Sequence, residues 1–272
     1  MNASVNLELE EKLYAAYLDF FKKAERERRW NVFEDVPWDK INREGSQEGA
    51  LCAETFVAVE LYLPDYIAGG LNAVRPYFGQ LWFQANWGYE ESKHSLGLME
   101  YLVRSGKRTQ QQMFELQQRT FAKKWVAPFD TARRMTVYGM FQEQATFLIY
   151  VKQREAAKDK ENDECLYKLY DFIARDEIAH TRFYQSVIKV LLEEDRDGTL
   201  CDIAHVASNF RMPAEDLIPD YDSRIEVMRA EGAIDRNVFL EKVYFPCLKF
   251  LGIERRDMMA AVKRSRIAAT AA

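Results

Sequence analysis

The chain has 272 residues, 48% of them hydrophobic, which is enough to bury a substantial core. Its 38 basic and 43 acidic side chains are spread along the sequence and leave a net charge of -5, which argues against nonspecific nucleic-acid binding. No run approaches the roughly 20 apolar residues of a membrane-spanning helix, and the first residues lack a signal-peptide core. The four cysteines form no C-x-x-C pair, which favours a reducing compartment. We expect a soluble, cytoplasmic protein that binds neither nucleic acid nor membrane.

Hydrophobic residues recur at spacings of three and four without sustained alternation, which predicts an all-α fold. The expected helices, in chain order, are 7–29, 48–74, 77–105, 108–127, 130–158, 161–193, 199–209, 222–231, 235–250 and 254–266. Turns are expected at Ser105-Gly106, Pro128 and Asp197-Gly198, and a break or kink at Arg75-Pro76. No Ser/Gly-rich or Pro-rich stretch of the kind that links domains interrupts the sequence. We predict a single domain over residues 1–272, with a bundle core at about 48–193 and accessory helices at about 7–29 and 199–266.

Two of the long helices expected in this core carry the same short motif. Residues 90–94 read E-E-S-K-H and residues 176–180 read D-E-I-A-H, so each contains E-x-x-H. A glutamate and a histidine three residues apart on a helix point the same way. Each motif therefore offers one carboxylate and one imidazole to a single metal ion.

The other two long helices each place a lone carboxylate in an apolar stripe, Glu60 in the segment 48–74 and Glu143 in the segment 130–158. Burying such unpaired carboxylates costs several kcal/mol apiece, so cations must neutralise them. One Glu from each of two helices plus a Glu-x-x-His from each of the other two is the ligand set of ferritin-like di-iron and di-manganese bundles. The predicted ligands are Glu60, Glu91, His94, Glu143, Glu177 and His180. Carboxylates with one nitrogen per metal favour iron or manganese over zinc or copper.

Three residues close to these ligands in the sequence, Glu90, Asp176 and Thr146, are further candidates for the site. Glu90 and Asp176 are predicted to accept the outer N–H of the histidines on the neighbouring helix, unless they form a solvated surface pair. Thr146, one turn after Glu143, either reaches the metal pocket or bonds to the carbonyl four residues earlier. His205 has no comparable partner and is expected to be a core or surface histidine.

These segments resemble the soluble acyl-acyl-carrier-protein (acyl-ACP) desaturase family, part of the ferritin-like di-iron carboxylate superfamily. The two histidine motifs are similar to that family's E-E-N-R-H, with Trp87 at its tryptophan, and D-E-K-R-H. Residues 141–147, F-Q-E-Q-A-T-F, are similar to F-Q-E-R-A-T-F, and residues 60–66, E-L-Y-L-P-D-Y, to E-E-A-L-P-T-Y. The resemblance covers most of residues 30–250.

The resemblance implies an O2-dependent oxidase with two irons that introduces a double bond into an acyl chain held as a thioester on acyl carrier protein. It further implies a ferredoxin-type electron donor, a homodimer, and a role for Thr146 in proton delivery or O2 activation. The acyl chain would lie near Tyr66, Gly69 and Met135. Glycines 69 and 70 stand where the family has bulkier residues, which leaves chain length and double-bond position open.

The chain also departs from the family pattern. Lys93 and Ala179 replace the arginine that precedes each histidine, so the surroundings of the cluster are expected to differ. An acidic carrier would need a local basic patch; the candidates are Lys22, Lys23, Arg26 and Arg28, or Lys263, Arg264 and Arg266. Alternative functions are a di-iron hydroxylase or N-oxygenase, and a non-catalytic ferritin-like metal-binding protein. A ribonucleotide-reductase small subunit would require a radical at a tyrosine such as Tyr150 or Tyr184.

Overall fold

The computed structural model describes residues 6–214, 216–230 and 236–271, and these residues form helices and no strand, which confirms the all-α class. The α-helices are α1 Leu7–Lys23, α2 Gln47–Glu60, α3 Leu63–Ala73, α4 Phe78–Arg104, α5 Gln110–Phe121, α6 Ala132–Asp159, α7 Glu164–Glu194, α8 Arg196–Ser208, α9 Tyr221–Ala230, α10 Arg236–Val238, α11 Phe245–Phe250 and α12 Arg255–Ala271. Short π- or 3-10 helices cover Ala24–Arg28 (η1), Trp38–Lys40 (η2) and Phe239–Tyr244 (η3). None of the described helices is long and apolar enough to cross a membrane.

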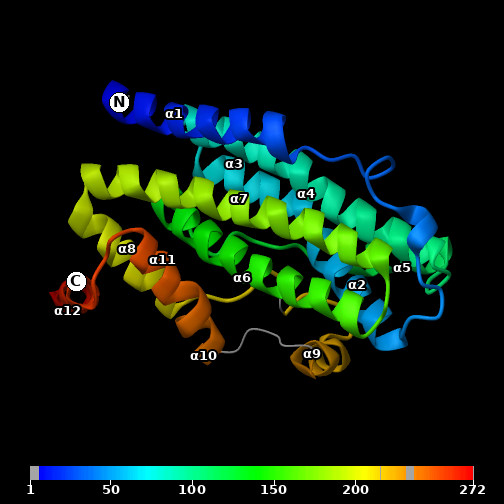
Figure 1. Cartoon of the computed structure of the whole chain (residues 1–272). Coiled ribbons are helices and arrows are strands. Elements are labelled where there is room, and N and C mark those ends of the chain that lie inside the picture. The colour runs from blue at the N-terminus through cyan, green and yellow to red at the C-terminus, as the bar shows by residue number, and fades with distance from the viewer. Residues whose placement is uncertain (1–5, 215, 231–235, 272) are drawn as a thin grey trace.

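The long helices α4, α6 and α7 run side by side, and α1 lies along the top of the view in Figure 1. Phe83 near the start of α4 stacks on Phe183 near the end of α7, with ring centroids 3.5 Å apart. Gly139 near the start of α6 lies against the ring of Tyr184, also near the end of α7. Helix α7 is therefore antiparallel to both, and α2 packs against α4 to complete a four-helix bundle.

Two apolar clusters follow one another along this bundle. One contains Phe83, Phe141 and Phe183, and the other contains Leu98 and Tyr170 among its buried residues. The predicted metal ligands on α4 and α7 lie between the two clusters along each helix, and Glu143 on α6 lies in the last part of the first cluster, next to the second. The polar centre of the bundle is thus enclosed by hydrocarbon at both ends.

The relative position of α4 and α7 is fixed at the helix termini. Asp163 caps α7 by accepting from the backbone N–H of Leu166 at 2.8 Å, and it also accepts from the hydroxyl of Tyr101 on α4 at 2.9 Å. Just beyond the same end of α4, Gly106 adopts φ +75°, a conformation that glycine tolerates without strain. The predicted turn at Ser105-Gly106 is confirmed.

Several helix boundaries differ from the sequence prediction: α5 ends at Phe121 rather than at 127, and α12 continues to Ala271 rather than to 266. The expected helix 48–74 is broken at Leu61 and Tyr62, because Pro64 lacks a backbone N–H and cannot donate to the carbonyl of Glu60 four residues earlier. Glu60 is consequently the last residue of α2. The expected turn at Asp197-Gly198 is wrong as well, because Asp195 accepts from the backbone N–H of Gly198 and caps α8, which starts at Arg196, three residues before the expected start at 199.

Candidate metal centre

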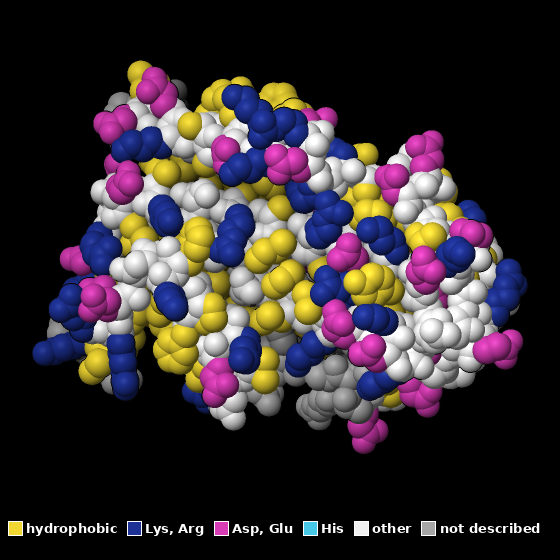
Figure 2. All heavy atoms as spheres, viewed as in Figure 1, with side chains coloured by type: hydrophobic (Ala, Val, Ile, Leu, Met, Phe, Trp, Pro, Cys, Tyr) yellow, Lys and Arg dark blue, Asp and Glu magenta, His cyan; other side chains and the backbone are white. Residues whose placement is uncertain are grey.

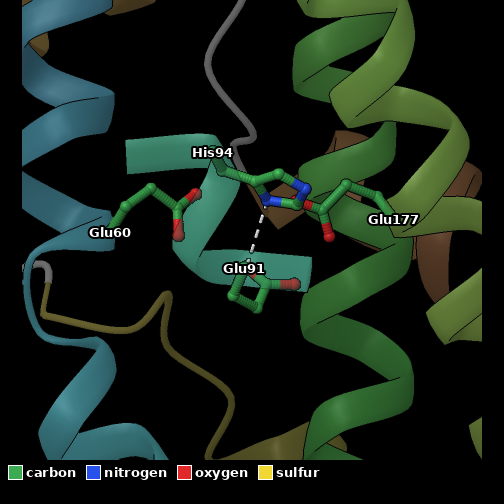
Figure 3. A group of neighbouring side chains, drawn as sticks. All are labelled: Glu60, Glu91, His94 and Glu177. Atoms are coloured by element: carbon green, nitrogen blue, oxygen red, sulfur yellow. Dashed lines mark ion pairs between the residues drawn. The ribbon is translucent and has the colours of Figure 1, made fainter. Parts of the chain in front are cut away.

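The structure brings all six predicted ligands together in the interior of the bundle. Each is buried, and both histidines and Glu143 are completely inaccessible. Figure 3 shows Glu60 from α2, Glu91 and His94 from α4, and Glu177 from α7 converging on one point. Within the described residues, ligand atoms fall into two groups in which all atoms lie within 4.8 Å of one another: Glu60, Glu91, His94 and Glu177, and Glu91, Glu143, Glu177 and His180.

The same inward nitrogen of each histidine faces the carboxylates. Nδ1 of His94 lies 3.2 Å from Glu91 Oε2 and 3.5 Å from Glu177 Oε1. Nδ1 of His180 lies 3.0 Å from Glu91 Oε1, 3.2 Å from Glu143 Oε2 and 3.9 Å from Glu177 Oε2. Glu91 and Glu177 are thus shared between the two histidines, and the imidazole centroids are 6.4 Å apart.

The outer nitrogens of the histidines each meet a carboxylate on the opposite helix. Nε2 of His94 on α4 lies 3.3 Å from Oδ2 of Asp176 on α7. Nε2 of His180 on α7 lies 2.7 Å from Oε2 of Glu90 on α4. Both carboxylates are fully buried, so neither belongs to a solvated surface pair. Such contacts orient an imidazole and set which ring nitrogen carries the proton.

A short segment after α1 holds these two carboxylates in turn. Arg28 donates to Asp176 through Nη1 and to both oxygens of Glu90 through Nη2, at 2.9 and 3.0 Å. Arg29 adds a second guanidinium on Glu90. Trp30 donates its indole N–H to Oδ2 of Asp176 at 2.7 Å. One guanidinium, that of Arg28, therefore connects the outer partners of both imidazoles.

The electrostatics of the cluster favour added positive charge. Burial raises the pKa of Glu60 to about 8, with repulsion from Glu91 adding to the rise. Burial also raises the pKa of Glu177 well above its usual value, together with the charges of Glu91 and Glu143. Burial by itself would lower the pKa of His94, but the carboxylates of Glu91 and Asp176 together outweigh burial and raise that pKa to about 10. The protein alone holds protons on these groups, and divalent cations would supply the same charge in their place.

Unsatisfied polar atoms test whether metal ions fit here. Nδ1 of His94 and both oxygens of Glu177 are buried and have no hydrogen-bond partner among the described residues. A buried polar atom without a partner costs about 1–3 kcal/mol. An imidazole nitrogen and carboxylate oxygens directed at a common point are donors that a divalent first-row metal accepts. The donor set therefore fits a two-metal site.

The lone glutamates are each oriented by an aromatic donor. Tyr150 donates its hydroxyl to Oε1 of Glu60 at 2.9 Å, and Trp87 donates its indole N–H to Oε1 of Glu143 at 3.1 Å. Thr146 is half-buried, and its hydroxyl donates to the backbone carbonyl of Gln142 at 2.8 Å. Its hydrogen is thus directed along its own helix, and its oxygen remains available as an acceptor.

A cavity of about 40 Å³ lies beside the cluster, with Trp87, Tyr66 and Met135 in its wall. Gly69 does not line it and instead lies in a separate surface depression of about 660 Å³, whereas Gly70 faces the cavity. Trp125 lines both spaces, and its ring packs edge-on against Tyr66 with centroids 4.8 Å apart. Trp125 therefore separates the cavity from the surface.

Sequence reasoning missed several residues of the site. The sequence places Arg28 in a possible docking patch, but its side chain is only 11% exposed and is bound to Glu90 and Asp176. Trp30 and Tyr150 carry no motif, and only a fold that brings them to Asp176 and Glu60 reveals their contacts. His205 is exposed on α8 and belongs to neither group of donor atoms.

A four-helix bundle that buries four glutamates and two histidines in this arrangement is a ferritin-like carboxylate bundle. Residues 73–254 match the model of a family described as fatty acid desaturase, and the chain belongs to that family. The resemblance found in the motifs is thereby confirmed.

Similar proteins agree with this assignment. The chain is 29% identical over 203 residues to a chloroplastic stearoyl-ACP 9-desaturase of Arabidopsis thaliana, covering 71% of this chain and 50% of that one. It is 28% identical over 175 residues to the chloroplastic stearoyl-ACP 9-desaturase of Helianthus annuus, covering 64% and 44%. The chain thus spans about half the length of the curated relatives it matches.

Solved structures share the fold. A candidate acyl-ACP desaturase, DesA2 of Mycobacterium tuberculosis H37Rv, superposes with a TM-score of 0.68 at 19% identity, over 93% of this chain and 99% of that one. A variant of an R2-like ligand-binding oxidase with a Mn/Fe cofactor superposes with a TM-score of 0.56 at 14% identity, over 94% and 99%. These likenesses confirm the ferritin-like architecture.

Proposed function

We propose that this protein is an O2-dependent di-iron oxidase that introduces a double bond into an acyl chain carried as a thioester on acyl carrier protein. The observation that supports this most directly is the buried cluster of four glutamates and two histidines with a cavity against one side of it. Trp87 connects the cluster with the cavity, since its indole N–H donates to Glu143 and its side chain lines the cavity. A substrate in that cavity would lie next to the metals in a site closed to bulk water.

The ligand assignment follows from the two overlapping groups of donor atoms. Glu60 and His94 would bind one ion, and Glu143 and His180 the other. Glu91 and Glu177 occur in both groups and would bridge the pair. We favour iron over manganese because the reaction needs a redox-active metal that binds O2, whereas the donor set alone accepts either.

Desaturation is a balanced redox reaction. The acyl chain loses two hydrogens, a ferredoxin-type donor supplies two electrons, two protons enter, and O2 is reduced to two molecules of water. When bound, the two irons supply the O2 activation that this chemistry requires. The apolar clusters at both ends of the site exclude water and protect the oxidant from side reactions. Thr146, one turn after Glu143, is proposed to take part in proton delivery or O2 activation, for which its hydroxyl would have to rotate away from the carbonyl of Gln142.

Substrate entry would involve Trp125. The cavity of about 40 Å³ has room for only a few small groups, whereas the depression on the other side of Trp125 measures about 660 Å³. Rotation of this indole away from Tyr66 would join the two spaces and admit an alkyl chain. Tyr66 and Met135 would then contact the chain inside, and Gly69 would lie at the entrance.

The proposed macromolecular partners are acyl carrier protein, a ferredoxin-type donor and a second copy of the chain. Figure 2 shows Lys and Arg side chains gathered over α1 at the top of the view. Lys22, Lys23 and Arg26 are exposed there and would attract an acidic carrier, although Lys23 and Arg26 also pair with neighbouring acids. Lys263 and Arg264 on α12 are the second candidate, although Arg264 also pairs with Asp197, and the side chain of Arg266 lies outside the described part of the chain.

Reaction of the iron-loaded, chemically reduced protein with O2 and a panel of acyl-ACP substrates tests the proposal. Mass spectrometry of the acyl chain should show the loss of two hydrogens. The addition of one oxygen atom would move the assignment to hydroxylation. No change with any acyl chain, under conditions where the protein holds two irons, would leave only a metal-binding bundle.

A further inference from the structure

The wall of the cavity beside the metal cluster is more polar than an alkyl chain requires. Three of its polar side chains come from different long helices: Gln84 from α4, Gln142 from α6 and Tyr184 from α7. Gln142 directly precedes the predicted ligand Glu143, and Tyr184 lies one turn after the predicted ligand His180. The three side chains therefore belong to the same part of the bundle as the metal ligands.

None of these three side chains has a hydrogen-bond partner among the residues that the structure describes. Gln84 and Tyr184 are only 6% and 8% exposed, so they are largely shielded from bulk water. Thr136 also lines the cavity, but its hydroxyl already donates to the carbonyl of Ala132 and accepts from Gln80, both at 2.7 Å. Two carboxamides and one phenol hydroxyl of the wall thus remain available to a bound molecule.

Two glycines of the same wall make room for these polar groups. A Cβ atom at Gly70 would lie 2.5 Å from Nε2 of Gln84, and a Cβ atom at Gly139 would lie 2.6 Å from Cζ of Tyr184. Both distances are shorter than real contacts of a Cβ atom, so a side chain at either position would displace the carboxamide or the ring. The space at Gly70 is therefore occupied by a polar group and does not lengthen a channel for an alkyl chain.

A plain alkyl chain is a poor match for this wall. Polar groups that face a cavity of about 40 Å³ are satisfied either by water or by a polar ligand, and an alkyl chain would displace water without replacing its hydrogen bonds. A hydroxyl group on the chain would accept from Tyr184 or an amide N–H and donate to an amide oxygen, whereas a carbonyl group would leave the amide oxygens unpaired. Burial holds the pKa of Tyr184 well above its ordinary value, so its hydroxyl keeps the proton that it would donate.

We propose that the acyl substrate carries a hydroxyl group, which binds between Gln84, Gln142 and Tyr184 beside the metal centre. The inference rests on the proposed function for the acyl chain and its carrier, and it narrows the substrate class to hydroxylated chains. The bound hydroxyl would fix the position of the chain in the cavity, and with it the carbon atoms presented to the metals. A chain without the hydroxyl would be rejected because it leaves buried polar groups unpaired.

Binding measured without turnover tests the inference. Calorimetry of the iron-loaded protein with O2 excluded compares octanoyl carrier protein with carriers whose octanoyl chain has a hydroxyl at each successive carbon atom. At least one hydroxylated chain should bind about 10- to 100-fold more tightly than the plain chain. Binding of the plain chain at least as tight as that of every hydroxylated chain would overturn the inference alone. If no carrier binds, the proposed function is overturned as well, whereas a hydroxyl preference without desaturation upholds the inference and removes only the desaturase assignment.

Two variants test which side chains hold the hydroxyl. Gln84→Leu and Tyr184→Phe each remove polar atoms and keep a side chain of similar size, so each should weaken binding of the preferred hydroxylated chain about tenfold without weakening that of the plain chain. Gln118→Leu makes the same chemical change at an exposed position on α5 and should alter neither affinity. If Gln84→Leu loses helical circular dichroism, Tyr184→Phe decides, because it removes a single oxygen atom. An unchanged preference in the folded variants would overturn the assignment.

Discussion

His94 and His180 occupy equivalent places in the two halves of the metal centre, yet their surroundings differ. Asp176 holds His94 and also accepts from the indole of Trp30. Glu90 holds His180 and is bound by two guanidinium groups instead. The lone glutamates differ in the same way, since one accepts from a tyrosine and the other from a tryptophan.

The two halves share the contact on the outer nitrogen of the histidine and differ in the groups around that contact. In each half a carboxylate contacts the outer nitrogen of the imidazole, and this contact fixes the orientation of the ring and which nitrogen carries the proton. The groups that contact those two carboxylates are not equivalent, and among the described residues only Arg28 donates to both. We therefore expect some substitutions to act on one ion, and substitution of Arg28 to act on both.

Removing one histidine should have the largest effect. His94→Ala and His180→Ala each take away one nitrogen ligand, so each variant should retain one of two ions and lose the oxidase reaction. Metal analysis after reconstitution with ferrous iron measures the stoichiometry. His205→Ala, on exposed α8, is the matched control and should bind two ions. Retention of two ions by both ligand variants would contradict the assignment.

Arg28→Gln should weaken both ions together, by about 10- to 100-fold, because substitutions behind a metal ligand typically cost that much affinity. Competition with a chelator measures each binding step. Arg26→Gln, two residues earlier and 70% exposed, is the matched control and should have no effect.

A second substitution should sharpen this result. Lys93 lies 3.8 Å from Asp176, at the position where the family motif has arginine. Lys93→Arg should partly restore metal affinity in the Arg28→Gln protein by returning a guanidinium to Asp176. Arg28→Gln should change the reduction potential of the iron-loaded site, and Lys93→Arg should shift that potential back toward the native value. Loss of helical structure in Arg28→Gln without any rescue would show that Arg28 serves folding alone.

Trp30→Phe should act on one half only. The phenyl ring can keep the stacking on Phe172, whose centroid lies 5.0 Å from that of Trp30, but the donor to Asp176 is lost. A hydrogen bond to a charged group is worth about 1.5–3 kcal/mol, and only part of that reaches the metal through Asp176 and His94, so roughly a three- to tenfold weaker binding of the ion at His94 is expected. A two-step chelator titration distinguishes the ions, and equal weakening of both would refute the separation of the halves.

Tyr150→Phe should have the smallest effect. It removes the hydroxyl that donates to Glu60 in a fully buried position. The metal-free protein should lose about 1 kcal/mol of unfolding free energy, measured by urea denaturation. Trp87→Phe makes the matched change at Glu143, and a much larger loss from either variant would show that packing rather than the hydrogen bond dominates.

The sequence predicted the site through repetition rather than through any single motif. One E-x-x-H on a helix is weak evidence, but two of them with Glu60 and Glu143 in apolar stripes match the ligand pattern of a known bundle. The sequence did not predict contacts with segments that are distant along the chain. Arg28 was assigned to a surface run because its neighbours along the chain are charged, and only the path of the chain after α1 directs it inward. The end of α2 at Glu60 was missed because its apolar periodicity continues past Pro64.

By itself, the sequence determined the helical class, the four helices that carry carboxylates and the six residues that meet in the bundle, because a helix places residues three and four apart on one face wherever it lies. The tertiary structure alone decided which groups stand behind the histidines, that Trp125 lies between the cavity and the surface, and that Gly70 rather than Gly69 faces the cavity. Those features depend on how separate segments pack against one another, and local periodicity carries no information about that packing.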